Sequence, residues 1–278
     1  TDRAGAPLMN ILIAVDGSHF SHRAARFGAL LAEALDAECR LLGVAESRQD
    51  EQELADLLAE LSPALGLDPE PGTVVRTGKP VEQILAEIQA YGADLLVVGA
   101  RGRGMVGRWF LGNTAYQLVE RATVPVVIVR RSRPQIRKIL VCTAGGPSGR
   151  HNVEYAAMIA ARTGAELTIL HVMSQIALQP GLHGVPMEAD ASWHIEHGTP
   201  EGEHLRELLA IAQRAGASAT AEIRHGLVVD EICDEARSVD YDLVAIGAHR
   251  GKGFMRFLID DLTADIIGRL NRPILIVR

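Results

Sequence analysis

The sequence predicts an α/β protein made of two tandem doubly wound parallel-sheet domains. Short β-branched runs alternate with longer segments of helical period, a pattern typical of right-handed βαβ crossovers. The runs are almost wholly apolar, as expected for strands that helices cover on both faces. This order of segments occurs twice along the 278 residues. We therefore expect five parallel strands in each domain.

The internal repeat divides the chain. Its anchors are short apolar runs, glycines and prolines at matching places: 11–13 and 139–141, Val44 and Val172, Gly99 and Gly247, Pro125 and Pro273. The first two pairs are 128 residues apart and the last two are 148 apart, so the second copy carries an insertion of 20 residues. We expect domain 1 at 8–131 and domain 2 at 136–278, with an inserted loop at 174–200.

Within the first repeat each element has its own signal. β-branched and apolar runs predict strands near 10–15, 39–45, 72–77, 94–99 and 125–130. Apolar residues at helical spacing predict three helices between them: Ala24, Phe27, Leu31 and Leu35; Leu54, Leu57, Leu58 and Leu61; Val81, Ile84, Leu85 and Ile88. A fourth helix is expected to begin near 112–114, with Leu118 and Val119 inward and Pro125 marking its end.

Composition narrows the class of protein. Charged residues make up 23% and hydrophobic residues 47%, as in ordinary globular proteins. A net charge of -7 argues against nucleic acid as a partner, because backbone binding needs clustered Lys and Arg. No apolar run approaches a membrane span, residues 1–7 do not resemble a secretory signal, and three cysteines without CxxC spacing form no disulfide framework. We expect a cytoplasmic protein that does not enter a membrane.

The segment from Gly99 to Thr114 has the chemistry of a phosphate site. Gly99, Gly102 and Gly112 are spaced G-x2-G-x9-G after an apolar strand and before a helix. Such glycines let the backbone approach an anion and take positive φ, while the helix start offers N–H groups and the positive end of its dipole. Arg101 and Arg103 add positive charge. A flexible loop is the alternative interpretation of the glycines. For Asp16, which begins Asp-Gly-Ser, a turn or helix cap is the alternative to a place in the ligand site.

At these residues the chain resembles the universal stress protein family in its tandem two-domain form. The resemblance spans nearly the whole chain and is carried by four segments: 11–18 (Ile-Leu-Ile-Ala-Val-Asp-Gly-Ser), 78–80 (Gly-Lys-Pro), 99–114 and 124–129 (Val-Pro-Val-Val-Ile-Val). The family pattern places Ser or Thr after the last glycine, whereas this chain has Asn113, which also donates and accepts hydrogen bonds.

The resemblance implies a Rossmann-like sheet of order 3-2-1-4-5 with an adenine nucleotide between strands one and four. Ala14, Val15, Asp16 and Val44 would surround the adenine. Gly99 and Gly102 would lie by the ribose and first phosphates, and Gly112, Asn113 and Thr114 would hold the outer phosphates. The implied ligand is ATP, or AMP or ADP, with Mg²⁺. It also implies that domains pair through their last strands, and we expect the tandem chain to form a homodimer.

The second repeat departs from the family pattern at two ligand positions. Ala144 replaces the aspartate equivalent to Asp16, and Asp261 replaces the glycine equivalent to Gly112. A carboxylate at that point would repel phosphate, so we expect this half to be silenced. The insertion contains His183, His194 and His197, with His204 following it. Imidazoles can bind metal, but no metal-binding motif accompanies them, and a loop over an apolar surface or subunit interface is the preferred interpretation.

Three classes of function remain. The preferred one is an ATP-binding regulator in the stress response that acts on an unknown protein partner. A nucleotide-independent interaction module is the alternative, and an adenylating or ATP-hydrolysing enzyme ranks last. His19, Ser21 and His22 lie close in sequence, but no nucleophile elbow accompanies them, and we expect them at the exposed start of a helix. We therefore assign no catalytic residue and expect at most slow ATP hydrolysis.

Overall fold

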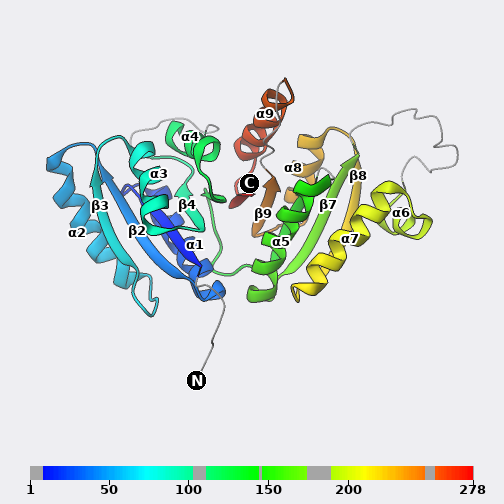
Figure 1. Ribbon diagram of the computed structural model, residues 1–278, viewed down its shortest axis with the longest axis horizontal. Coiled ribbons are helices and arrows are strands. Elements are labelled where there is room, and N and C mark those ends of the chain that lie inside the picture. Colours follow the sequence, from blue (N-terminus) through cyan, green and yellow to red (C-terminus); the bar gives the residue numbers. More distant parts are fainter. Residues whose placement is uncertain (1–8, 103–110, 144–145, 174–188, 248–253, 278) are drawn as a thin grey trace. The chain divides into compact units, whose positions relative to one another are not determined.

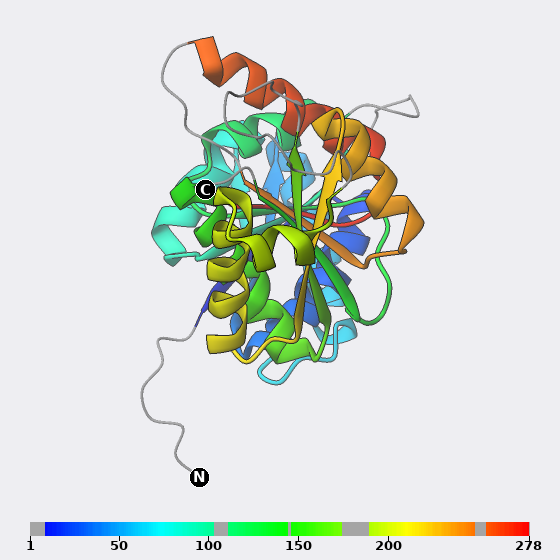
Figure 2. The same cartoon turned by 90° about the vertical axis from the view of Figure 1, so that its right-hand side faces the viewer.

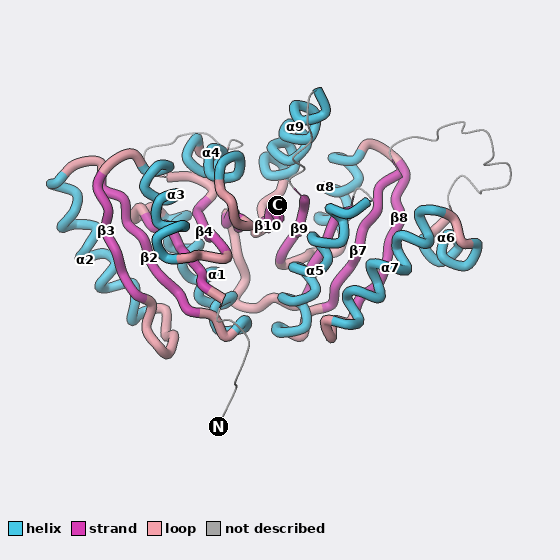
Figure 3. The backbone as a smooth tube through the Cα atoms, viewed as in Figure 1, coloured by secondary structure: helices cyan, strands magenta, loops and turns pink. Residues whose placement is uncertain are grey.

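The chain folds into two compact α/β units, Thr1–Gln135 and Ile136–Arg278. The computed structural model describes residues 9–102, 111–143, 146–173, 189–247 and 254–277. Each unit contains a parallel sheet with helices packed on it (Figures 1 and 3). The predicted fold class is thereby confirmed.

Unit 1 has the strand order β3-β2-β1-β4-β5. Its strands, all parallel, are β1 (Asn10–Val15), β2 (Glu38–Ala45), β3 (Gly72–Thr77), β4 (Leu95–Gly99) and β5 (Val126–Val129). Its helices are α1 (His19–Leu35), α2 (Arg48–Ala64), α3 (Pro80–Tyr91) and α4 (Asn113–Arg121). The order 3-2-1-4-5 agrees with the prediction, and each strand begins and ends within one residue of its predicted bounds.

The faces of the sheet are assigned by close contacts between strands and helices. A Cβ at Gly28 of α1 would touch Ile13 and Val97, and a Cβ at Gly43 of β2 would touch Leu54 and Leu58 of α2. Since Ile13 pairs with Val97, and Gly43 with Val15 two residues further along β1, α1 and α2 cover the same face. Right-handed crossovers put α3 and α4 on the other face. Both faces of β1 and β4 are therefore covered, as their apolar sequences predict.

Unit 2 repeats this topology, with strand order β8-β7-β6-β9-β10. Its strands are β6 (Lys138–Thr143), β7 (Glu166–Met173), β8 (Ala219–His225), β9 (Leu243–Gly247) and β10 (Ile274–Val277). Its helices are α5 (Gly146–Thr163), α6 (Ala191–His197), α7 (Pro200–Arg214), α8 (Val228–Ser238) and α9 (Phe254–Arg269). All of its strand pairs are parallel.

Part of the inserted segment, expected as a loop at 174–200, is helical. Asp190 caps α6, since its side chain accepts a hydrogen bond from the Trp193 N–H (2.8 Å), and Gly198 ends the helix with φ 62°. The sequence therefore carried both helix-end signals. Residues 174–188 lie outside the described residues.

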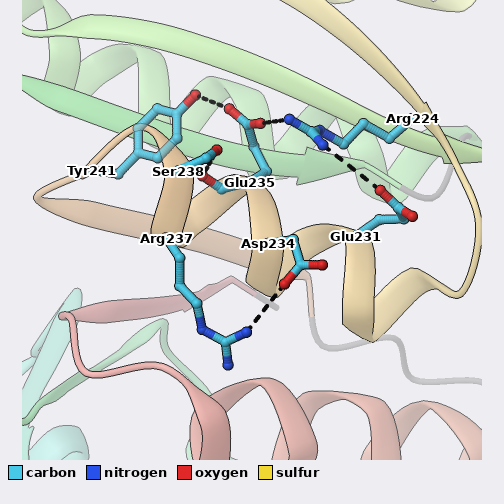
Figure 4. Close-up of polar contacts among 7 residues, drawn as sticks. All are labelled: Arg224, Glu231, Asp234, Glu235, Arg237, Ser238 and Tyr241. Atoms are coloured by element: carbon cyan, nitrogen blue, oxygen red, sulfur yellow. Dashed lines mark hydrogen bonds and ion pairs between the residues drawn. The ribbon is translucent and has the colours of Figure 1, made fainter.

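In both units a buried carboxylate joins the third strand to the helix that follows it. In unit 1, Glu87 on α3 is 2% exposed and binds Arg40 of β2 (2.9 Å) and Arg76 of β3. In unit 2, Glu235 on α8 binds Arg224 of β8 and accepts a hydrogen bond from the Tyr241 hydroxyl (2.7 Å; Figure 4). The pairs Arg76–Glu87 and Arg224–Glu235 occupy equivalent positions of the repeat, 148 residues apart.

We expect Glu87→Ala to lower the free energy of unfolding of the full chain by about 2 kcal/mol, because two guanidinium groups lose their shared acceptor. Fully buried pairs lose roughly 3–5 kcal/mol, and the partial exposure of both arginines reduces that figure. Urea denaturation measures the change. Glu82→Ala is the matched control on the same helix, since Glu82 and its partner Lys79 are exposed, and it should cost below about 1 kcal/mol. Equal losses in the two variants would contradict a structural role for the buried pair.

Candidate functional site

A cavity of about 430 Å³ lies in unit 1 at the carboxyl ends of β1, β2 and β4. Every predicted site residue that the structure describes lines it: Ala14, Val15, Asp16, Val44, Gly99, Arg101, Gly102, Gly112, Asn113 and Thr114. Arg103 lies outside the described residues. The volume falls in the range of roughly 300–1,000 Å³ that small-molecule sites occupy. The structure thus brings together residues that are up to 100 positions apart in sequence.

The loops after β1 and β4 are tied to each other across the cavity mouth. Asp16 Oδ1 accepts a hydrogen bond from the Ser18 N–H (2.9 Å), and the Ser18 hydroxyl lies 3.3 Å from the Arg101 carbonyl. Ser18 also caps α1 by accepting from the Ser21 N–H (3.2 Å). The turn interpretation of Asp16 therefore holds for its local bonding, while the residue also lines the cavity. The two roles coexist.

Glycine is required at two positions because neighbouring atoms come close. A Cβ at Gly99 would lie 2.8 Å from the Phe20 carbonyl carbon and 2.9 Å from the Ser21 nitrogen, and a Cβ at Gly102 would lie 2.8 Å from Asp16 Oδ2. The expectation of positive φ was wrong, since neither residue has it and Gly112 has φ -64°. The missing side chain lets the end of β4 pack against the first turn of α1 at Gly99 and lets the loop after β4 approach Asp16 at Gly102, and neither position uses a left-handed backbone.

The start of α4 offers backbone donors to the cavity. Gly112 is the N-cap residue and has no side chain that could accept from the first amides of the helix. Its own N–H donates to the Ala100 carbonyl (2.9 Å), which fixes the loop to the end of β4. Asn113 and Thr114 are exposed at the cavity. Free N–H groups and the positive end of the helix dipole make this an anion-binding arrangement.

Charges of both signs lie around the cavity. Arg101 lines it together with Asp16, Glu46 and Asp50. The Arg130 guanidinium, directly after β5, is buried, and its pKa is lowered first by burial and then by the positive charge of Arg101. Arg101 thus brings positive charge to a cavity whose wall also carries three carboxylates, and Arg130 lies close enough to Arg101 for their charges to interact.

Several lining residues escaped the sequence analysis. Ser21 was assigned to an exposed helix start, but it is 3% exposed and lines the cavity, because the first turn of α1 packs against Gly99 at the end of β4. Glu46 and Asp50 line the cavity beyond β2. The placement of Val44 at the end of β2 was the signal that could have found Glu46. His19, in contrast, is exposed as expected.

The equivalent region of unit 2 has different side chains. By strand register, Thr143 corresponds to Val15 and His171 to Gly43. Thr143 Oγ1 lies 3.1 Å from His204 Nε2, and the Thr143 carbonyl lies 3.2 Å from His171 Nδ1. Burial lowers the pKa of both imidazoles, which favours their neutral form at pH 7. A polar group thus stands where unit 1 has an apolar wall.

A compensating small residue makes room for this polar group. A Cβ at Gly149 of α5 would lie 2.3 Å from Thr143 Oγ1 and 3.4 Å from His204 Nε2. In unit 1 the corresponding residue, 128 positions earlier, is Ser21. Ala144 and the side chain of Asp261 lie outside the described part of the chain, so silencing by those two residues stays a prediction.

Two further classes of feature were sought among the described residues. No group of three or more His, Cys, Asp or Glu side chains in this part of the chain is placed to hold a metal ion. None of the helices, over the residues described, is long and apolar enough to cross a membrane.

Comparison with known proteins identifies similar chains. The sequence model of the universal stress protein family matches residues 7–130 and 135–278. A Thermus aquaticus universal stress protein is 32% identical over 133 residues, covering 43% of this chain and 97% of its own. A Mycobacterium tuberculosis universal stress protein is 27% identical over 201 residues, covering 67% of this chain. The matches span 58–62% of the length of the mycobacterial relatives.

Solved structures share the fold over almost the whole chain. A Pseudomonas aeruginosa chain has a TM-score of 0.72 at 21% identity and covers 97% of this chain and 93% of its own. A universal stress protein from Archaeoglobus fulgidus has a TM-score of 0.67 at 16% identity and covers 97% of this chain and 96% of its own. At these identities the likeness concerns the fold alone.

We expect Gly99→Ala to lower the free energy of unfolding by about 1–3 kcal/mol, because its Cβ would meet backbone atoms that cannot rotate away. Gly72→Ala is the matched control, since that strand glycine has its nearest outside atom 3.9 Å from the added Cβ, and it should change stability by about 0.5 kcal/mol or less. Urea denaturation of both variants measures the difference. A Gly99→Ala protein as stable as the control would show that the end of β4 is not held against the first turn of α1 as described.

Proposed function

Because the family model matches both of its units, the chain belongs to the universal stress protein family, and we propose that unit 1 binds an adenine nucleotide that regulates the protein in the stress response. The observation that carries this proposal is a single cavity with an apolar wall at one end and the uncapped start of α4 at the other. A nucleotide needs both, since its base is flat and largely apolar while its phosphates are anionic.

The wall formed by β1 and β2 supports the adenine end of the proposal. Ala14, Val15, Leu42 and Val44 supply apolar contact, and Asp16 supplies a carboxylate that can accept from an exocyclic amino group. The 430 Å³ volume is large enough for a base and its ribose without displacing the wall. The proposed ligand is ATP, or AMP or ADP, because the family resemblance implies an adenine nucleotide and the exocyclic amino group of adenine can donate to Asp16.

The segment around Gly112 supports the phosphate end. Gly112 leaves the first amides of α4 without a side-chain acceptor, and Asn113 and Thr114 are exposed beside them. Gly99 and Gly102 let the loop lie close to Asp16, and Arg101 adds positive charge. Asp16, Glu46 and Asp50 would repel a bare polyphosphate, so Mg²⁺ is expected to accompany ATP.

The second half of the proposal is that unit 2 does not bind the same nucleotide. The hydrogen-bonded Thr143, His171 and His204 stand where the apolar wall of unit 1 would receive a base. Burying an adenine there would break these bonds without replacing them. Together with Ala144 and Asp261, these residues support one nucleotide per chain.

The proposed role is regulation rather than catalysis. A ligand that binds one conformation or assembly state stabilises it, so nucleotide level can control which state is populated. We propose a cytoplasmic homodimer with an unidentified protein partner as the regulated species. No side chain at the cavity is arranged as a nucleophile with a neighbouring base among the residues described, and turnover of ATP is therefore expected to be slow at most.

Calorimetric titration of the purified chain with ATP and Mg²⁺ should give one site per chain. The stoichiometry is decisive because the two units share a fold but differ in side chains. Two sites per chain would show that unit 2 accepts the nucleotide. Absence of saturable binding would overturn the nucleotide proposal and favour a nucleotide-independent interaction module.

Gly112→Asp should abolish ATP binding while leaving stability unchanged or slightly higher. The backbone of Gly112 (φ -64°, ψ 146°) suits an Asp N-cap, but the new carboxylate would accept the amides that phosphate needs and repel it. Gly112→Asn is the matched control, since it adds a side chain of the same size without charge and should weaken binding much less. Equal affinity of Gly112→Asp and wild type in the same titration would remove α4 from the site.

Asp16→Asn should lower ATP affinity by about 10- to 100-fold, the effect of losing one charged hydrogen-bond acceptor. The amide retains an oxygen that can accept from the Ser18 N–H, so the turn is expected to persist. Unfolding by urea checks that stability is unchanged. An affinity within twofold of wild type would exclude Asp16 from base recognition.

A further inference from the structure

Helix α6 of unit 2 has no counterpart in unit 1. There, Glu46 and Ser47 alone connect β2 to α2, whereas the equivalent connection of unit 2 runs from the end of β7 at Met173 to the start of α7 at Pro200. Residues 189–199 are the described part of this connection that precedes α7. Figures 1 and 2 show α6 beside α7.

The last turn of α6 is packed directly against the first turn of α7. A Cβ at Gly202 would lie 1.9 Å from the His194 carbonyl oxygen, so no larger residue fits between the two helices. The same carbonyl accepts a hydrogen bond from the Thr199 N–H (3.2 Å), and the Arg206 side chain binds the Ile195 carbonyl. At the other end, His225 Nε2 of β8 lies 3.3 Å from the Ala189 carbonyl.

His194 is the side chain at the centre of this contact. It is 1% exposed, and its Nδ1 lies 2.9 Å from the Thr199 hydroxyl, which also accepts the Gly202 N–H (3.1 Å) at the start of α7. Its Nε2 is buried without a hydrogen-bond partner in the part of the chain that the structure describes. A neutral ring needs only one strong partner here, but a protonated ring would place a second N–H and a charge where none of the described residues offers an acceptor.

Charged and titratable groups approach His194 from every element packed against it. They are Asp190 at the start of α6, Glu201 of α7, His171 of β7 and His225 of β8. Burial has the largest effect and lowers the pKa of His194, while the two carboxylates oppose this shift and the two imidazoles add to it. The surroundings therefore favour the neutral ring.

We propose that docking of α6 onto α7 and β8 is controlled by a proton on His194, so that mild acid releases residues 189–199 from unit 2. The neutral ring fills the buried position between the helices. The protonated ring moves from this buried position into water. Helix α6 then separates from α7 and β8, because few hydrogen bonds hold its two ends. Release changes the surface of unit 2 next to its His171 and His204 pair, and it requires no nucleotide.

The direction of the pH effect follows from the lowered pKa. In the released state the ring is solvated and titrates near its ordinary value of about 6.5. Above that pH both states hold a neutral ring and docking does not depend on pH. Below it the released state takes up a proton that the docked state resists, so the docking equilibrium weakens by at most about tenfold per pH unit. The effect ends once pH falls below the pKa of the docked ring.

Hydrogen exchange of the full chain, without nucleotide, at pH 7.5 and 5.5 tests the proposal. After correction for intrinsic exchange rates, amides in 190–199 should lose protection at pH 5.5, while those of α1 and α3 in unit 1 keep theirs. His194→Leu and His194→Asn cannot be protonated, and both should keep the protection of 190–199 equal at the two pH values. His197→Gln is the matched control on the same helix, since His197 is exposed, and it should respond to pH as the wild type does.

Two results would overturn the proposal. One is wild-type protection of 190–199 that does not change between the two pH values, and the other is a pH response that persists in His194→Leu or His194→Asn, which would assign it to His171 or His225. Should both variants fail to dock at pH 7.5, an NMR titration of the wild-type His194 Cε1–H decides. Its midpoint must coincide with the pH at which protection is lost, and a clearly separate midpoint would also overturn the proposal.

Discussion

The parallel pairing of β1 with β4 is the constraint on which the proposed site depends. Helices α1 and α2 lie on one face of the sheet, and α3 and α4 lie on the other. The chain therefore leaves β1 and β4 toward opposite faces. The two loops diverge beyond Ala14 and Val98, which are paired in register, and an opening remains at the carboxyl edge. β6 and β9 pair in the same way in unit 2. Topology therefore supplies the same strand junction twice, and side chains decide its use.

Most of the fold could be predicted because its signals are local. Apolar β-branched runs, helical spacing and residues such as Pro80 and Pro125 limit each element without reference to distant parts of the chain. The family resemblance then supplied what single elements cannot, namely a strand order in which distant residues such as Asp16 and Gly102 meet. The predictions were wrong where one residue type can have either of two structural roles. A glycine in the sequence can serve close packing, as at Gly99, or a left-handed backbone, and the sequence does not distinguish the two. Ser21 shows likewise that a polar residue near a helix cap can face inward.

Comparison of the two units shows that their side chains changed in matched sets. Thr143 and His171 bring polar atoms to the carboxyl edge of unit 2, and the Thr143 hydroxyl fits beside His204 only because Gly149 has no side chain. Each of these residues alone would be unremarkable in the sequence. Their effect is visible only when strand register aligns them with Val15, Gly43 and Ser21 of unit 1. In the sequence, Ala144 and Asp261 indicate that the two units diverged. In the structure, the divergence is seen at other residues of the same carboxyl edge, namely the set around Thr143.

The ion pairs Arg76–Glu87 and Arg224–Glu235 stayed alike while the cavity residues diverged. Glu87 and Arg76 do not line the cavity of unit 1; they join the third strand to the third helix away from it. Foldability and ligand choice thus reside in different residues of the same domain. In a duplicated copy, residues at the carboxyl edge can consequently be substituted without loss of the fold. Tandem chains of this kind can therefore give rise to two domains with different functions.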